Sequence, residues 1–545
     1  MRRTASRALR SARCSLQQSK WSVNVNRAAI GSTIASVNPS LSLSPPRCSN
    51  LQFRNFSATA RLRNEEDRQW STPLAKQLAE AIAATGPIPL ASYMRMCLTA
   101  DIGGYYTGAI EEGRDQFGVK GDFITAPEIS QVFGELCGIW FLTEWLAQNS
   151  PSKGVELIEV GPGRGTLMDD MLRTIQVCHP PMANSIDVIY MVEASPELRL
   201  AQKNLLCGEN APMTESKVGY HSVCKYNAVP IVWTETIKSI PIAPENTPFI
   251  MAHEFFDALP IHAFQCVSVP PSPSTDNSSP STQTTHATLQ WRELLVSPTP
   301  PGSTHDTLKT PPSQSRDTPP PDFQLTLSPT PTRHSLYLPD SSARYRAIKT
   351  TTGAGAVIEV CPDASLYAGD FAVRIGGSPQ HPKPSPRGAA LIIDYGPGDG
   401  SVPVNSLRGI RRHRRVSPFA EPGLTDLSAD VDFKAIAEAA CRASDGVEVH
   451  GPVQQAFFLT ALGIRERVEA LKRAVGGTTT TTTGEGGKEG GEEDAEQRRK
   501  SIELACDRLV NRMPGGMGTV YKVLAIIPEK GGERRPVGFG GDVVN

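Results

Sequence analysis

Three groups of residues in this 545-residue sequence have types and spacings that suit chemistry. The first is the segment Glu159-Val160-Gly161-Pro162-Gly163-Arg164-Gly165, in which an acidic residue precedes a glycine-rich turn. Glycines lack a Cβ atom, so a ligand can pack directly on the backbone, and a helix that starts after the turn offers free N–H groups. A strand, this turn and a helix in succession therefore predict a binding site for a small cofactor.

The spacing of these glycines favours one cofactor over others. Turns that bind nicotinamide cofactors more often read GxGxxG, and phosphate-binding loops continue with Gly-Lys-Ser or Gly-Lys-Thr. This turn reads GxGxG with an acid two residues ahead, which favours S-adenosylmethionine, bound by Glu159, Gly161, Gly163 and Gly165. A tight turn without a ligand, in some other α/β protein, is the alternative interpretation.

The second group is Glu193, which ends the predicted strand 186–192 and lies 32 residues after Gly161. A β-α-β unit of about 30 residues brings such an acid to the neighbouring strand end. There its carboxylate can accept hydrogen bonds from both hydroxyls of a ribose. Alternatively, Glu193 is an acid at the N-terminus of the helix that starts near Pro196.

The third group contains Glu254 and Asp257, which follow the predicted strand 249–252. Ligands of open α/β sheets lie beyond the carboxyl ends of the strands, so these side chains should face the reacting methyl group. Two carboxylates can grip a cationic acceptor in a bidentate manner, which suits a guanidinium better than an ammonium. We predict Glu254 and Asp257 as the catalytic residues, which would orient the acceptor and take up its proton. The alternative is that one caps a helix and the other pairs with a structural arginine.

Two further segments contain residues that could bind a ligand or a partner. Thr125 and Glu128 lie in a predicted loop before the helix 130–146 and are assigned to the cofactor site. An arginine-rich run, Arg408, Arg411, Arg412, Arg414 and Arg415, could bind RNA or an acidic protein, but side chains that are solvated or paired with carboxylates are the favoured interpretation. No metal site is predicted, because the cysteines lack CxxC spacing and His253 and His413 lack metal-ligand spacing.

The elements around these residues alternate between strand and helix. Strands are expected at 155–160, 186–192 and 249–252, with helices from Thr166 and Pro196. This alternation predicts an α/β protein with a mainly parallel sheet. Residues 262–267 and 289–296 should form a hairpin in a Pro-, Ser- and Thr-rich insertion that is otherwise expected to be disordered.

The N-terminus differs from the rest of the chain in charge. Residues 1–64 contain ten Arg and one Lys but no Asp or Glu, whereas the whole chain has a formal net charge of -1. A basic, Ser-rich segment without acids is typical of a mitochondrial presequence, and we expect cleavage after Phe56. No stretch reaches the roughly 18 apolar residues of a membrane span, so the mature protein is predicted to lie in the matrix.

Together, the motifs resemble those of the MidA-like family, mitochondrial protein arginine methyltransferases that act as complex I assembly factors. The resemblance covers about residues 74–527 without the insertions and rests on the segments 125–135, 159–165, 253–260, 393–396, 429–433 and 517–524. It implies a class I methyltransferase (Rossmann-like) fold with seven strands and S-adenosyl-L-methionine as donor. It also implies symmetric dimethylation of an arginine on a core matrix-arm subunit of complex I, the iron-sulfur protein subunit two.

The predicted organisation follows from these elements. It comprises a presequence at 1–56, a linker at 57–69, an N-terminal helical cap at 70–150, the first part of the core at 151–266, the insertion at 267–335, the continued core at 336–475, a disordered loop at 476–497, a final helix and strand at 498–530 and a tail at 531–545. The expected partner is a protein substrate and not nucleic acid. A homodimer is possible. The alternative functions are a non-catalytic assembly chaperone with this fold and an RNA or small-molecule methyltransferase.

Overall fold

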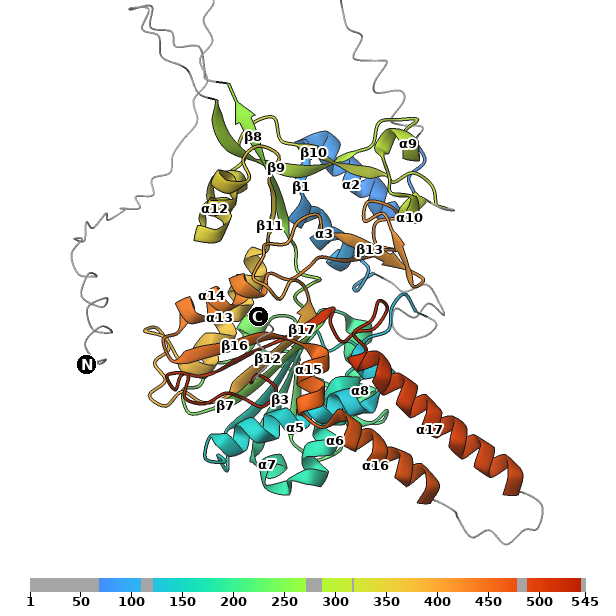
Figure 1. Cartoon of the computed structure of the whole chain (residues 1–545), viewed down its shortest axis with the longest axis vertical. Helices are drawn as coiled ribbons and strands as arrows, with labels where there is room; N and C mark the ends of the chain where they lie inside the picture. The colour runs from blue at the N-terminus through green and yellow to red at the C-terminus, as the bar shows by residue number, and fades with distance from the viewer. Residues whose placement is uncertain (1–67, 109–120, 271–286, 316–317, 478–487, 541–545) are drawn as a thin grey trace, which may run out of the picture. The chain divides into compact units, whose positions relative to one another are not determined.

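The computed structural model describes residues 68–108, 121–270, 287–315, 318–477 and 488–540 (Figure 1). Every described residue belongs to one compact unit, which lies within residues 64–545. The predicted presequence therefore lies outside the described residues. In the part of the chain that the structure describes, no helix has the length and apolar composition to cross a membrane.

The centre of this unit is a sheet of nine strands in the order β16-β17-β12-β7-β2-β3-β6-β5-β4. Its middle consists of adjacent parallel strands: β12 (Ala389–Tyr395), β7 (Thr247–His253), β2 (Val155–Val160), β3 (Ile186–Val192) and β6 (Pro230–Thr234). The antiparallel pair β16 (Val447–Gln454) and β17 (Tyr521–Pro528) closes one edge, while β5 (Tyr220–Val223) and β4 (Thr214–Glu215) extend the other.

The expected mainly parallel sheet is present, but the expected number of seven strands is wrong. The strands from β16 to β6 make up seven, and the short strands β5 and β4 bring the total to nine. These two strands contain four and two residues, and β4 is fully exposed. Such short segments have no alternating apolar pattern, so no strand is predicted there from the sequence.

Helices cover both faces of the sheet because its central strands are apolar on both sides. All six residues of β2 are buried. One face packs against α5 (Gln131–Ala147) and α6 (Thr166–Cys178), and the other against α13 (Pro362–Gly376) and α14 (Phe433–Ala443). Helix α5 falls within the predicted N-terminal cap, yet it packs on the core through large side chains such as Trp140 and Phe141.

A second, smaller sheet carries the N-terminal helices. It contains β1 (Ile88–Pro89), β9 (Thr288–Pro298), β8 (His262–Val269) and β11 (Val357–Val360), with β10 (Phe323–Leu327) also paired to β9. Strands β8 and β9 form the predicted antiparallel hairpin, in which Val269 pairs with Thr288. The predicted helices α2 (Pro73–Thr85) and α3 (Leu90–Thr99) share a hydrophobic core with this sheet.

Part of the insertion that was expected to be disordered is folded. After β9 the chain forms the short helices α9 (His305–Leu308) and α10 (Pro312–Ser315), then β10 and α11 (Arg333–Tyr337). Phe323 accounts for this order, because it is fully buried and its ring lies 5.8 Å from that of Trp70 and 5.7 Å from that of Tyr93. One buried aromatic side chain thus anchors a segment whose composition alone suggested no core.

The C-terminal helices also differ from the prediction in detail. The helix expected over residues 456–474 is divided at Gly463, which has a φ of 83°, into α15 (Gln455–Ala461) and α16 (Ile464–Gly477). Helix α17 (Lys488–Val510) begins inside the predicted loop 476–497. The remaining elements are α4 (Ala126–Ile129), α7 (Pro180–Ser185), α8 (Pro196–Cys207), η1 (Ile237–Ser239), η2 (Leu338–Asp340), α12 (Ala343–Thr351), β13 (Arg408–Arg411), β14 (Arg414–Val416) and β15 (Asp426–Ser428).

Candidate active site

A cavity of about 630 Å³ lies at the carboxyl ends of the central parallel strands. This volume is typical of a small-molecule site. Of the predicted site residues, eight line it: Thr125, Glu128, Glu159, Gly161, Gly163, Glu193, Glu254 and Asp257. Gly165 is not among the lining residues. Its role is steric, because a Cβ atom there would lie 3.2 Å from Cγ of Gln202 on α8.

The glycine turn connects β2 to α6 and uses backbone conformations that other residues adopt with difficulty. Gly161 and Gly163 have φ values of 66° and 52°. A Cβ atom on Gly161 would also lie 2.8 Å from the ring of Phe255, which is too close for a real contact. The turn can therefore form only with glycine at this position, and it leaves the N-terminus of α6 open to the cavity.

Glu128 fixes the first turn of α6 from the side. Its Oε1 accepts a hydrogen bond of 2.7 Å from Oγ1 of Thr166, and its Oε2 lies 3.5 Å from Nη1 of Arg164. Thr125 precedes the short helix α4 that carries Glu128. These two residues of the predicted closing loop thus lie against the glycine turn, where a ligand on the turn would contact them.

Glu159 and Glu193 stand at the ends of neighbouring strands, and both are buried. Burial and, to a lesser extent, the charge of Glu193 raise the pKa of Glu159 to about 8. Its Oε2 has no hydrogen-bond partner in the structure. Burial also raises the pKa of Glu193 to about 7, although its carboxylate accepts a hydrogen bond of 2.8 Å from the backbone N–H of Ser195.

Gln202 on α8 links these groups, and the sequence interpretation missed it. Its side-chain N–H₂ donates to the carbonyl oxygen of Gly163 at 2.6 Å and to Oε2 of Glu193 at 3.2 Å. Its Oε1 accepts a hydrogen bond of 2.9 Å from the indole N–H of Trp233. A lone glutamine on a helix carries no sequence signal for such a role.

The acidic pair lies on the loop that leaves β7. Glu254 has a φ of 49°, a left-handed conformation that is uncommon for residues other than glycine. Its Oε1 accepts a hydrogen bond of 2.8 Å from the hydroxyl of Tyr521, whose own hydroxyl contacts that of Tyr395. Burial raises the pKa of Glu254 to about 8, and the nearby charge of Asp257 adds to this shift.

Asp257 shares its surroundings with a third acid and an arginine. Burial raises its pKa to about 6, while the cation of Arg408 opposes that shift. Burial and the charge of Asp257 raise the pKa of Asp426 to about 7. The guanidinium of Arg408 lies 2.5 Å from Oδ1 of Asp430, and its Nη2 is buried without a hydrogen-bond partner. The cavity therefore contains a cluster of buried acids beside Arg408, and neither Asp426 nor Arg408 is predicted from the sequence as a residue of the site.

Asp394 positions the whole acidic loop. It is the second-last residue of β12 and is fully buried. Its Oδ2 accepts backbone N–H bonds from Phe255 at 3.1 Å, Phe256 at 2.9 Å and Asp257 at 3.3 Å. From the sequence, Asp394 is identified only as part of the segment 393–396. The rule that ligands lie beyond the carboxyl ends of parallel strands, which identified Glu193, applies to Asp394 equally.

His253 does not act as an ion-pair partner here. Its Nε2 lies 3.4 Å from Oε1 of Glu254, but burial lowers its pKa to about 3, so the imidazole is neutral. Its ring packs near Phe133, with 4.9 Å between the centroids. His253 is thus part of the apolar wall of the site.

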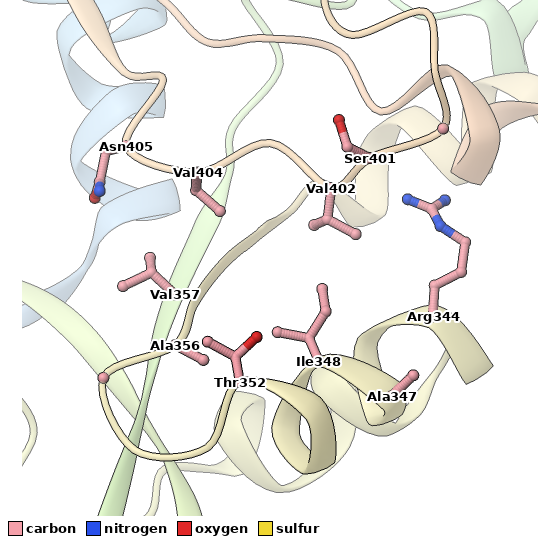
Figure 2. Close-up of a pocket in the computed structure, with 12 residues that line it drawn as sticks. Arg344, Ala347, Ile348, Thr352, Ala356, Val357, Ser401, Val402, Val404 and Asn405 are labelled. Carbon is pink, nitrogen blue, oxygen red and sulfur yellow. The ribbon is translucent and has the colours of Figure 1, made fainter.

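A second cavity, of about 670 Å³, lies between α12 and the segment 400–405 (Figure 2). Arg344 is the only ionisable residue among those that line it. Its guanidinium already forms an ion pair of 2.9 Å with Asp432. This cavity offers no group for acid-base chemistry, so the carboxylate-rich cavity is the candidate site.

Comparison with known proteins agrees with this geometry. Residues 136–453 match a family described as S-adenosyl-L-methionine-dependent methyltransferases. The chain is similar to "Protein arginine methyltransferase NDUFAF7, mitochondrial" of Danio rerio, with 35% identity over 73% of this chain and 78% of that protein. It is 34% identical to the Homo sapiens protein of the same name, over 75% of this chain and 77% of that one.

A solved structure supports the fold. A crystal structure of a COG1565 superfamily member from Burkholderia thailandensis, bound to S-adenosyl-homocysteine, superposes with a TM-score of 0.56. It has 22% sequence identity and covers 86% of this chain and 93% of that one. The residues of the cavity fit this cofactor. The unpaired carboxylate oxygen of Glu159 can accept a hydrogen bond from its amino group, Glu193 can accept hydrogen bonds from its ribose, and the glycine turn leaves room for it on the backbone. The chain therefore belongs to this family of S-adenosyl-L-methionine-dependent methyltransferases and uses S-adenosyl-L-methionine as its cofactor.

Proposed function

We propose that this enzyme methylates an arginine side chain of a protein substrate. The observation that carries the proposal is a single cavity that joins the glycine turn to the buried acids Glu254, Asp257 and Asp426. A cluster of carboxylates with raised pKa values is costly to ionise unless a cation binds there. The names of the relatives, protein arginine methyltransferases, point to the same acceptor.

On the donor side, the two strand-end acids bind different parts of the cofactor. Glu193 accepts hydrogen bonds from the ribose hydroxyls, held in place by Gln202. The unpaired Oε2 of Glu159 receives the cationic amino group of the methionine part, which would return its raised pKa toward the ordinary range. The bound cofactor supplies a methyl group on a sulfonium, whose thioether is a good leaving group.

On the acceptor side, the acids hold the guanidinium and manage its proton. An arginine side chain has a pKa above about 12, so it arrives charged and must lose a proton as the methyl group is transferred. Asp257 orients the guanidinium by charge. Glu254, with a pKa of about 8, accepts the proton, and the hydroxyl of Tyr521 keeps its carboxylate in place.

The finer assignment concerns substrate and compartment. We propose symmetric dimethylation of an arginine on a complex I core subunit, the iron-sulfur protein subunit two, within the mitochondrial matrix and in support of complex I assembly. The resemblance of the motifs, the basic N-terminal segment and the mitochondrial names of the relatives support this assignment.

Transfer of a tritiated methyl group tests the proposal. The full chain is incubated with labelled cofactor and a matrix extract from cells that lack the protein, and the labelled residue is identified by mass spectrometry. We expect label on arginine, and Asp257→Asn and Glu254→Gln should each lower the rate at least about 100-fold with unchanged cofactor affinity. Asp445→Asn, which changes an exposed acid outside the cavity, is the matched control.

Other labelling outcomes separate the alternatives. Label on RNA or a small molecule would contradict a protein acceptor. Two arginines of the basic run already form ion pairs within the chain, Arg408 with Asp430 and Arg411 with Glu421, which argues against their binding RNA. Full rescue of complex I assembly by a folded variant that cannot bind the cofactor would favour a chaperone without turnover.

A further inference from the structure

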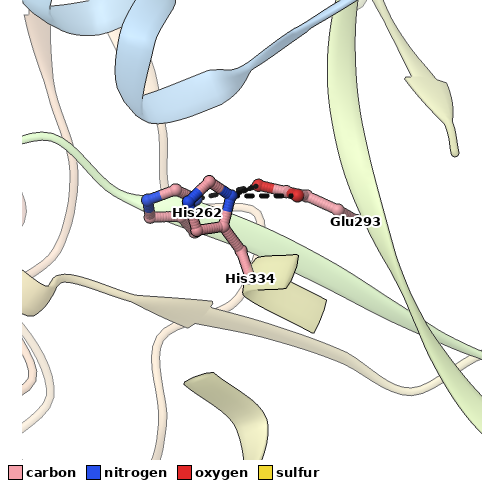
Figure 3. A group of neighbouring side chains, drawn as sticks. All are labelled: His262, Glu293 and His334. Atoms are coloured by element: carbon pink, nitrogen blue, oxygen red, sulfur yellow. Dashed lines mark hydrogen bonds and ion pairs between the residues drawn. The ribbon is translucent and has the colours of Figure 1, made fainter. Parts of the chain in front are cut away.

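Two histidines and a glutamate meet outside the active site, on the smaller sheet (Figure 3). Among the described residues they are the one group whose ligand atoms could surround a metal ion: His262, Glu293 and His334. His262 begins β8, Glu293 lies on the paired strand β9, and His334 lies on α11. Three separate elements therefore contribute one side chain each.

The distances between these atoms suit a small divalent cation. Nδ1 of His262 lies 2.8 Å from Oε1 of Glu293, and Nδ1 of His334 lies 3.2 Å from the same oxygen. All three ligand atoms lie within 4.8 Å of one another. Zn²⁺ binds imidazole nitrogen and carboxylate oxygen at about 2.0–2.2 Å in a tetrahedron, which places neighbouring ligand atoms about 3.3 Å apart.

The glutamate is held in position before any ion binds. Its side chain is almost fully buried, and Oε2 accepts a hydrogen bond from the hydroxyl of Thr332. The same hydroxyl accepts the backbone N–H of Ser335 at 3.1 Å and thereby caps α11, which carries His334. The backbone N–H of Glu293 donates to Oγ of Ser328 at 3.1 Å. Outer contacts of this kind orient metal ligands and tune their affinity.

The site is also accessible and carries suitable charge. The side chain of His334 is 45% exposed, so an ion can enter from solvent and keep water in its remaining positions. Glu293 supplies one carboxylate oxygen as an anionic ligand, and the two imidazoles supply one nitrogen ligand each. Two imidazoles and one carboxylate, with water in the remaining position, are a ligand set that holds Zn²⁺ in proteins.

We propose that His262, Glu293 and His334 bind one Zn²⁺ ion, which clamps α11 onto the β8–β9 hairpin. On binding, each histidine gives up the Nδ1–H bond to Glu293 and changes tautomer: its single proton then lies on Nε2, and the Nδ1 lone pair is free to bind the metal. The clamp lies next to the active site along the chain, because Pro260, two residues before His262, lines the catalytic cavity.

Titration of the full chain with Zn²⁺, after removal of metal by a chelator, tests this site. Isothermal calorimetry should show one ion per chain. His334→Ala and Glu293→Gln should each weaken binding at least about 100-fold, and Thr332→Val about 10-fold. His381→Ala, an exposed histidine outside the cluster, is the matched control and should change nothing. Affinity for S-adenosylmethionine, measured in the same variants, confirms that they are folded.

Two results would overturn the proposal. One is that the wild-type chain binds no Zn²⁺, or that the His334→Ala variant binds Zn²⁺ as well as the wild type does. Because the side chain of His334 is half exposed, this variant is expected to fold. The other concerns the nine free cysteines of the described residues. Co²⁺ bound in place of Zn²⁺ should give only weak absorption bands, so thiolate charge-transfer bands would assign the ion to cysteine instead.

Discussion

Glu254 combines two costly features in one residue. Its backbone is left-handed, with a φ of 49°, and its buried carboxyl has a pKa of about 8. A strained conformation of this kind costs about 1–3 kcal/mol and persists only where the surroundings enforce it. Here the backbone N–H donates to the carbonyl of Ile393 at 3.0 Å, and Tyr521 holds the side chain. The strain directs the carboxylate into the cavity beside Asp257.

The glycine turn allows a direct test of the cofactor site. Gly163 has a φ of 52°, and its carbonyl is bound by Gln202. Gly163→Val should abolish binding of S-adenosylmethionine, because a branched side chain would both fill the turn and disfavour its conformation. Calorimetry measures the affinity, and circular dichroism confirms the fold. Unchanged affinity in a folded variant would show that the cofactor binds elsewhere.

Sequence reasoning at this scale found the residues that obey simple positional rules. Glu159 lies near the end of a buried strand, Glu193 and the acidic pair follow such strands, and the structure places them around one cavity. Gln202, which contacts Gly163 and Glu193, and Asp426, which lines the cavity, could not be found in this way, because each belongs to an element whose local pattern is ordinary. The histidines of the proposed Zn²⁺ site lie 31 and 41 residues from Glu293, so no local spacing rule could reveal them.

At the scale of elements, the loop after β7 depends on the end of β12. Asp394 accepts three backbone N–H groups from that loop. Asp394→Asn should lower the free energy of unfolding by about 1–3 kcal/mol, because an amide cannot accept all of the bonds that this carboxylate accepts. It should also lower kcat, since the acidic pair loses its orientation, without changing cofactor affinity.

Urea unfolding and single-turnover kinetics measure these two effects. The matched control is Asp399→Asn, which changes an exposed aspartate shortly after the same strand. Equal losses in both variants would show that Asp394 has no special role in holding the loop.

The elements that were predicted well are those with long apolar runs. Strands β2 and β3 begin and end at the predicted residues, because their runs are bounded by polar residues and glycine. Strand β10 and the order around Phe323 were missed, since a single buried aromatic does not create a periodic pattern. Local pattern thus predicts the layers of the core and fails where one tertiary contact decides the structure.

At the scale of the whole molecule, the buried acids make stability depend on pH. The pKa values are raised to about 8 for Glu159 and Glu254, about 7 for Glu193 and Asp426, and about 6 for Asp257. In the unfolded chain these groups release their protons near pH 4. Between these values these carboxyls bind more protons in the folded state, so their contribution to stability is greatest at the acidic end and falls as pH rises.

We therefore expect the ligand-free enzyme to lose stability, on the order of a few kcal/mol, between about pH 5.5 and about pH 8. Urea unfolding at a series of pH values measures this slope. Glu254→Gln should make the slope shallower, because the amide does not titrate, whereas the exposed-site variant Asp445→Asn should leave it unchanged. A slope of opposite sign in this range would contradict the assignment of raised pKa values.

The continuity of the catalytic cavity has a consequence for inhibition. Gly161 and Asp257 line the same cavity of about 630 Å³. A compound in which a donor analogue is linked to a guanidine can therefore bind with its linker inside this cavity. When the adenosyl half binds, the tethered guanidine is presented to the acids at a high effective concentration. Such a bisubstrate compound gains selectivity over methyltransferases in which donor and acceptor enter through separate openings.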